Sequence, residues 1–168
     1  GKRTKVIQCS IIGPEMIGSA SLFQWFFDSD HSVEGYSNIH WNGITSLKWA
    51  GLAHHLISDW GKHEALILPY TDTITKYQLL LNIKEIWGLS TEVAPVTYGE
   101  KNYFPVQGNL KTESIKNQLS DLKNFYYIYH CLPTPILYVV EIATYCGDYP
   151  QPPPYKVVLS PVSTDFST

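Results

Sequence analysis

The clearest pattern of apolar and polar positions lies in residues 45–60, where apolar side chains recur at the spacing of an α-helix. Its apolar positions share one helical face and are Trp49, Leu52, Ala53, Leu56, Ile57 and Trp60. Asn42 or Thr45 can cap the start of this helix, and Gly61 stands where a helix commonly ends. The pattern predicts an amphipathic helix whose two-tryptophan face covers a sheet.

Short apolar runs on both sides of this helix predict strands. They span residues 5–12, 21–27, 36–41, 64–70, 92–98, 136–145 and 155–159. Two further helices are predicted, one over residues 74–87, capped by Asp72 or Thr73 and ended by Gly88, and one that is capped by Thr112. The aromatic run at residues 125–131 fits either a helix or a strand. We therefore expect a single α/β domain over residues 1–159 and a flexible tail over residues 160–168.

Composition supports a packed core and limits the partners. The 168 residues are 44% hydrophobic and 14% aromatic, which is enough to bury a core. Charged residues make up only 16%, the net charge is −3, and Arg3 is the only arginine. Because phosphate backbones are usually bound by clustered Lys and Arg, we expect weak or absent nucleic-acid binding.

Targeting and redox signals are sparse. The three cysteines, Cys9, Cys131 and Cys146, show no C-x-x-C spacing and are expected to be core thiols. The sequence has no glycosylation acceptor, no signal peptide and no apolar run long enough for a membrane span. We expect an intracellular protein without a membrane partner, with nucleus and cytoplasm both open. Because the chain begins at Gly1, we expect an excised domain or a processed product.

Two polar clusters could bind a cation. His55 and Asp59 are four residues apart on the first helix and His63 follows it, so with His54 they are weak candidates for Zn²⁺ ligands. The alternative is a solvated helix face with a His–Asp pair. The second cluster is an acidic turn, which also fits ordinary turn chemistry and contains Asp28, Asp30, His31 and Glu34.

A proline-rich segment near the end of the chain suggests a partner. Pro152, Pro153, Pro154 and Tyr155 fit the PPxY type of WW-domain ligand, which binds an aromatic groove as a pre-extended segment. The alternative is a rigid connector that leads into the last strand, with Tyr155 as its first packed residue. The sequence contains no P-loop, G-x-G-x-x-G or G-x-S-x-G, so nucleotide, dinucleotide and α/β-hydrolase sites have no support from motifs.

The order of these elements resembles the ribonuclease H-like superfamily. Residues 9–14, CSIIGP, look like the first strand of a retroviral or retrotransposon integrase catalytic core, and residues 22–28 look like its second strand with a terminal acid. The run from residue 60 to residue 87, with Trp-Gly-Lys, Leu-Pro and a final Trp, also resembles the connection subdomain of reverse transcriptases. The resemblance implies a three-layer fold with a mixed sheet of about five strands flanked by helices, plus a C-terminal β extension.

The resemblance also implies where catalytic carboxylates should stand. Integrase-like chemistry needs three acids that hold two Mg²⁺ ions, and the candidates here are Asp28, Asp72 and Glu113. The first strand offers no acid, and Lys48 stands where a live ribonuclease H would carry one in its first helix. This implies a catalytically degenerate member, a pseudoenzyme that needs no cofactor.

Three functions follow as hypotheses. The first is a non-catalytic protein-interaction domain of retroelement or viral origin, which binds a protein partner or forms a homo-oligomer. The second is an active Mg²⁺-dependent nuclease or polynucleotidyl transferase with rearranged acids. The third is an unrelated viral host-interaction protein with a Zn²⁺ or WW-ligand surface.

Overall fold

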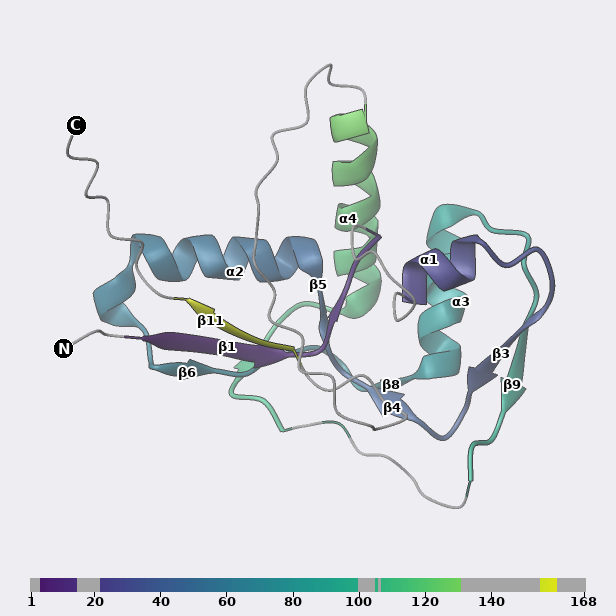
Figure 1. Cartoon of the computed structure of the whole chain (residues 1–168), viewed down its shortest axis with the longest axis horizontal. Coiled ribbons are helices and arrows are strands. Elements are labelled where there is room, and N and C mark those ends of the chain that lie inside the picture. Colours follow the sequence, from purple (N-terminus) through teal and green to yellow (C-terminus); the bar gives the residue numbers. More distant parts are fainter. Residues whose placement is uncertain (1–3, 15–21, 100–104, 106, 131–154, 160–168) are drawn as a thin grey trace.

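Helices and short strands alternate along the chain in this computed structural model, which describes residues 4–14, 22–99, 105, 107–130 and 155–159 (Figure 1). The helices are α1 (Leu22–Phe27), α2 (Ser46–Ser58), α3 (Lys76–Trp87) and α4 (Ile115–His130), with a 3₁₀ turn η1 (Trp60–Lys62) after α2. The strands are β1 (Lys5–Cys9), β2 (Ile11–Ile12), β3 (Val33–Tyr36), β4 (His40–Trp41), β5 (Ile44–Thr45), β6 (Leu66–Ile67), β7 (Pro69–Tyr70), β8 (Ile74–Thr75), β9 (Val93–Val96), β10 (Leu110–Lys111) and β11 (Tyr155–Leu159).

A three-stranded sheet has β1 at its centre. β11 pairs with β1 antiparallel along its whole length, from Lys5 opposite Leu159 to Cys9 opposite Tyr155. β6 pairs with the other edge of β1 in parallel. Burial alternates along β1, as expected for a strand with one face against a core. Figure 1 shows α2 lying alongside this sheet.

The helix predicted over residues 45–60 is confirmed as α2. The Thr45 side chain caps its start by accepting a hydrogen bond from the Lys48 backbone N–H at 3.3 Å. Trp49, Ala53 and Leu56 are buried, and they form one hydrophobic cluster with residues of β1, β5 and β6. The predicted end was wrong, because Asp59 is the C-cap and Gly61 belongs to η1.

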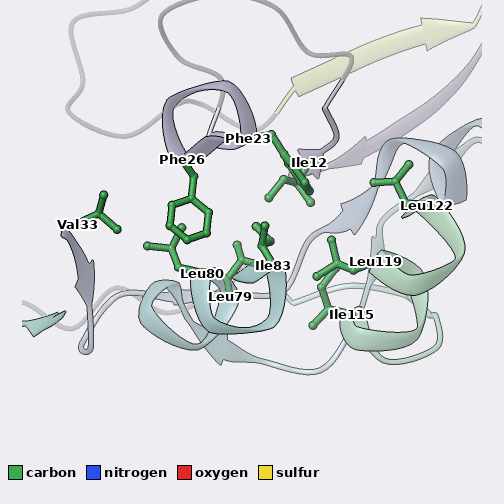
Figure 2. Close-up of a cluster of buried hydrophobic side chains, with 10 residues drawn as sticks. All are labelled: Ile12, Phe23, Phe26, Val33, Leu79, Leu80, Ile83, Ile115, Leu119 and Leu122. Atoms are coloured by element: carbon green, nitrogen blue, oxygen red, sulfur yellow. The ribbon is translucent and has the colours of Figure 1, made fainter. Parts of the chain in front are cut away.

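The segment predicted as the second strand, residues 21–27, forms a helix instead, and Ser21 lies outside the described residues. In α1 the side chains of Phe23 and Phe26, one turn apart, are both fully buried. They belong to a second hydrophobic cluster, in which α1 and β3 pack with α3 and α4 (Figure 2). Burial of this aromatic face stabilises a helix that six residues would not form alone.

The other two predicted helices are confirmed with corrected starts. α3 is capped by Thr75 rather than Asp72 or Thr73, and Gln78 completes a capping box. Gly88 ends α3 in a left-handed conformation with φ of 70°. α4 begins at Ile115, and Ser114 rather than Thr112 caps it, because Ser114 Oγ accepts a hydrogen bond from the Asn117 backbone N–H at 3.3 Å. The helix continues to His130, so the helical alternative for the aromatic run holds as far as the described residues reach.

The coarse α/β class is confirmed, but the described residues do not form the single mixed sheet that was expected. The remaining strands form separate two-stranded pairs: β2 with β5, β3 with β9 and β7 with β10, all parallel, and β4 with β8, antiparallel. Because residues 22–27 are helical, the three-strand meander that opens a ribonuclease H-like fold is missing from this part of the chain. The strand predicted over residues 136–145 and the tail lie outside the described residues.

None of the described helices is both long enough and apolar enough to cross a bilayer.

Candidate functional site

Polar side chains from the starts of α2 and α4 line a pocket of about 320 Å³. This volume falls in the range of small-molecule sites. Its lining consists of Thr45, Leu47, Lys48, Gly51, Leu52, His55, Glu113, Gln118 and Asp121. The pocket therefore combines an ammonium, two carboxyl groups, an imidazole and an amide beside two leucines.

An ion pair joins the two walls of this pocket. Lys48 Nζ lies 2.7 Å from Glu113 Oε2, and about a third of each side chain is exposed. Burial pushes the pKa of Glu113 up, but hydrogen bonds from the Lys48 side chain and the Glu113 backbone, together with the Lys48 charge, outweigh it and lower this pKa. Glu113 is therefore a carboxylate at neutral pH, able to accept hydrogen bonds from a ligand.

Gln118 fixes the geometry beneath the ion pair. Its side chain is 1% exposed, and its Oε1 accepts a hydrogen bond from the Thr45 backbone N–H at 3.1 Å. Its Nε2 donates to Thr112 Oγ1 at 3.0 Å and to the Glu113 carbonyl at 2.8 Å. One buried amide thus ties the first turn of α2 to the segment that leads into α4.

A second set of hydrogen bonds holds the segment that carries Glu113. Thr71 is buried, and its hydroxyl donates to the Glu113 carbonyl at 2.7 Å. The backbone N–H and the hydroxyl of Thr112 both donate to the Tyr70 carbonyl, at 2.8 and 2.9 Å. The glutamate is therefore presented from a backbone anchored on the chain at β7.

We expect Gln118→Met to lower the free energy of unfolding by about 1–3 kcal/mol, because it leaves the buried Thr45 N–H without an acceptor. The Glu113 carbonyl and the Thr112 hydroxyl lose less, since both keep a second hydrogen-bond partner. Urea denaturation measures the change. The matched control is Asn124→Met at an exposed position of α4, which should change stability by less than about 0.5 kcal/mol. Equal effects of the two variants would contradict this role for Gln118.

The three predicted carboxylates have three different partners. Asp28 Oδ2 accepts from Gln24 Nε2 at 2.6 Å, Asp72 pairs with Lys111 at 3.2 Å, and Glu113 pairs with Lys48. Across the residues that the structure describes, only one group of three or more His, Cys, Asp or Glu residues brings its ligand atoms together, and it contains none of these acids. Glu113 lines the pocket, whereas Asp28 and Asp72 do not.

The group that the structure does bring together is His55, Asp59 and His63, with one ligand atom from each within 4.8 Å of the others. These were the weak candidates for metal ligands. His54, which accompanied them in the sequence-based hypothesis, is exposed on α2 and lies outside the group.

The acidic turn lines a second, more open pocket. Asp28, Asp30, His31 and Glu34 lie here with Trp25 and Tyr36 around a volume of about 540 Å³. The turn is exposed, and no further feature of the described residues points to a cation in it.

The proline-rich segment and the cysteines are described only in part. Pro152, Pro153 and Pro154 lie outside the described residues, while Tyr155 begins β11 opposite Cys9. The WW-ligand hypothesis stays a prediction. Cys9 is a buried free thiol, and desolvation by burial raises its pKa to about 12, which fits a core residue. Cys131 and Cys146 lie outside the described residues.

Sequence reasoning named Lys48 and Glu113 separately but missed Gln118. The signal for Gln118 is its position, because it shares the helical spacing of Ile115, Leu119 and Leu122, all of which are buried. A polar residue within an apolar stripe is buried and must be hydrogen-bonded. That pattern predicts a structural amide rather than a solvated one.

Comparison with known proteins finds similarity in structure only. No family model and no curated protein sequence matches the chain. The chain is similar to a dTDP-4-dehydrorhamnose reductase from Yersinia enterocolitica, with a TM-score of 0.52 and 13% identity over 71% of this chain and 48% of that one. It is also similar to a dTDP-4-dehydrorhamnose reductase from Bacillus anthracis str. Ames in complex with NADP, with a TM-score of 0.54 and 11% identity over 68% of this chain and 45% of that one. The chain thus spans about half the length of these solved structures.

These neighbours correct the sequence-based assignment. They have an NAD(P)-binding Rossmann-like fold, so the resemblance to a ribonuclease H-like integrase core or a connection subdomain was wrong. Three hypotheses depended on that resemblance and are wrong as well. They are a retroelement or viral interaction domain, a pseudoenzyme of that family and an active nuclease. Many α/β folds share a similar order of strands and helices along the chain. They differ in which strands pair with one another, and element order does not reveal this pairing. What the similarity establishes is that this chain shares the fold of part of these reductases.

Proposed function

We propose that this chain recognises a nucleotide-linked sugar and serves as the substrate-binding part of a reductase-type protein. The observation that carries the proposal is the shared fold with two dTDP-4-dehydrorhamnose reductases across about two thirds of the chain or more. A shared fold alone does not determine function, so the proposal also depends on the chemistry of the pocket.

The pocket at the starts of α2 and α4 suits a polyhydroxylated ligand. Carboxylates accept hydrogen bonds from sugar hydroxyls, and the Glu113 carboxylate is held ionised beside Lys48. The Lys48 ammonium can donate to a hydroxyl or interact with a phosphate. Because both charges lie on anchored backbone, they are pre-organised for a ligand.

The proposal does not assign the dinucleotide to this chain. Dinucleotide-binding Rossmann folds hold the pyrophosphate with a G-x-G-x-x-G turn at a helix start, and this sequence has no such motif. We therefore expect NADP(H) to bind this chain at least tenfold more weakly than a dTDP-linked hexose does.

Isothermal titration calorimetry with dTDP-glucose tests the proposal. We expect saturable binding to the 168-residue chain and at least a tenfold loss of affinity in Lys48→Ala, because Lys48 is the only lysine or arginine of the pocket's lining. The matched control is Lys116→Ala, which removes another lysine of an exposed 2.7 Å ion pair, with Glu85, outside the pocket. Its affinity should equal that of the wild-type chain.

Titrations with dTDP and with glucose separate the contributions of nucleotide and sugar. If Lys48→Ala leaves dTDP-glucose binding unchanged, the ligand binds outside this pocket. Absence of binding at millimolar dTDP-glucose would overturn the proposed function itself.

A further inference from the structure

The end of α2 and the chain that follows it bring two imidazoles and one carboxylate together. α2 ends at Ser58, Asp59 is its C-cap, and η1 turns the chain so that His63 follows in extended backbone. The rings of His55 and His63 then meet edge to face, with centroids 4.9 Å apart and planes at 64°. Residues eight positions apart are thus placed side by side by the local fold.

One ligand atom from each of His55, Asp59 and His63 lies within 4.8 Å of the other two. Around a tetrahedral Zn²⁺, bonds of about 2.0–2.2 Å place ligand atoms roughly 3.4 Å apart. The separation can close by rotation of the side chains, since His55 is exposed and the other two residues are partly exposed.

One ring nitrogen of His63 is buried without a visible hydrogen-bond partner. This atom is Nε2, and it has no such partner within the described part of the chain. Buried polar atoms in folded proteins are nearly always satisfied, so this imidazole nitrogen, which no group of the described residues satisfies, fits a partner from outside them. A metal ion is one such partner.

The end of α2 also contributes a negative potential that favours a cation, against the positive charge of the buried Lys5, whose ammonium donates to the His63 carbonyl. The carbonyl end of α2 carries the negative end of the helix dipole, and Asp59 adds a carboxylate there. A lysine already uses this attraction, because Lys62 Nζ lies 3.0 Å from Asp59 Oδ1. Its side chain is 76% exposed, so it can swing into solvent when another cation arrives.

We propose that His55, Asp59 and His63 form a site for Zn²⁺. Two imidazole nitrogens and one carboxylate oxygen are a preferred donor set for this ion, and three protein ligands leave a fourth position for water. His55 also lines the pocket described above, whereas Asp59 and His63 do not. Variants of Asp59 and His63 therefore test the metal site independently of nucleotide-sugar binding, whereas a His55 variant can affect both sites.

Titration of Zn²⁺ into the untagged, chelator-treated chain tests the proposal by calorimetry. We expect one Zn²⁺ per chain with a Kd of about 10 μM or tighter, and at least a tenfold loss of affinity in His63→Ala and in His55→Ala. His54→Ala is the matched control, since His54 is exposed on the same helix and lies outside the group, and its Kd should be unchanged.

Two further measurements test the roles of Asp59 and His63 as metal ligands. Lys62→Gln removes the ammonium that competes for Asp59, so it should tighten Zn²⁺ binding several-fold. Co²⁺ in the same site should give the intense visible absorption of a four-coordinate ion, and His63→Gln, which keeps a polar side chain of similar size, should abolish it.

The proposal is overturned if the wild-type chain binds Zn²⁺ with a Kd weaker than about 10 μM, or if His54→Ala weakens binding as much as His63→Ala. Loss of Zn²⁺ binding in His63→Ala with dTDP-glucose binding intact would support the metal site alone. Unchanged Zn²⁺ binding in His63→Ala would overturn the metal site, whatever the result with dTDP-glucose.

Discussion

Gly43→Ala is expected to lower the free energy of unfolding by about 3 kcal/mol or more, at the upper end of the cost of overpacking. A Cβ atom at this position would lie 2.2 Å from the Ser10 carbonyl oxygen and 2.5 Å from the Trp41 ring. Because the first of these neighbours is backbone, the two segments must separate. The Ile44 N–H then loses its 2.9 Å hydrogen bond to Ser10, and the β2–β5 pair beside it is disturbed.

Gly51→Ala is the matched control for this variant and should have the opposite sign. Gly51 lies within α2, and a Cβ there would meet no heavy atom within 4 Å. Because glycine disfavours a helix interior relative to alanine, we expect about 1 kcal/mol of stabilisation. Chemical denaturation of both variants measures the contrast. Equal and small effects would contradict the close approach of residue 43 to Ser10.

Phe23→Ala is expected to lower the free energy of unfolding by about 3–5 kcal/mol, the usual cost of removing a fully buried aromatic side chain. Phe23 is 0% exposed and contacts two aromatic rings edge to face, with centroids 5.3 Å from Phe27 and 5.1 Å from Trp87. Its loss leaves a cavity between α1 and α3 and removes one of the two fully buried side chains that keep the short α1 helical (Figure 2).

Trp25→Ala provides the comparison on the same helix. Trp25 is 45% exposed, so truncation should cost less than about 1 kcal/mol. Thermal and urea unfolding of both variants measure the two changes in stability. Far-ultraviolet circular dichroism is the probe, because Trp25→Ala removes a tryptophan and so alters the fluorescence. An equal loss of stability in the two variants would contradict the burial of Phe23 and the exposure of Trp25 on α1.

The local elements were largely predictable where two signals agreed. α2, α3 and α4 each combine an apolar stripe at helical spacing with a polar residue before the first turn, and both signals act within a few residues. α1 was missed because its aromatic run favours a strand on propensity, and six residues are too few to reveal a helical period. Its helix depends on burial of Phe23 and Phe26 against α3, which is tertiary information.

The fold and most of the candidate site could not be predicted from the sequence either, because both depend on tertiary contacts. Which strands pair is set by contacts between distant segments, and several strands here are only two residues long. The pairing of Lys48 with Glu113 likewise joins helices far apart in the chain. By contrast, His55, Asp59 and His63 were predicted as a group because a single helix end places them together, and helical spacing is readable from sequence.

The position of β1 between β6 and β11 has a consequence for how the chain acquires its structure. The β1–β11 pair joins Lys5 to Leu159, so one edge of β1 is covered only when a strand far along the sequence pairs with it. Contacts of such long range slow folding, and until they form β1 presents an open edge that can pair with another molecule. Until β11 pairs with it, this edge of β1 is therefore a place where two molecules can associate, and pairing of the two strands closes it.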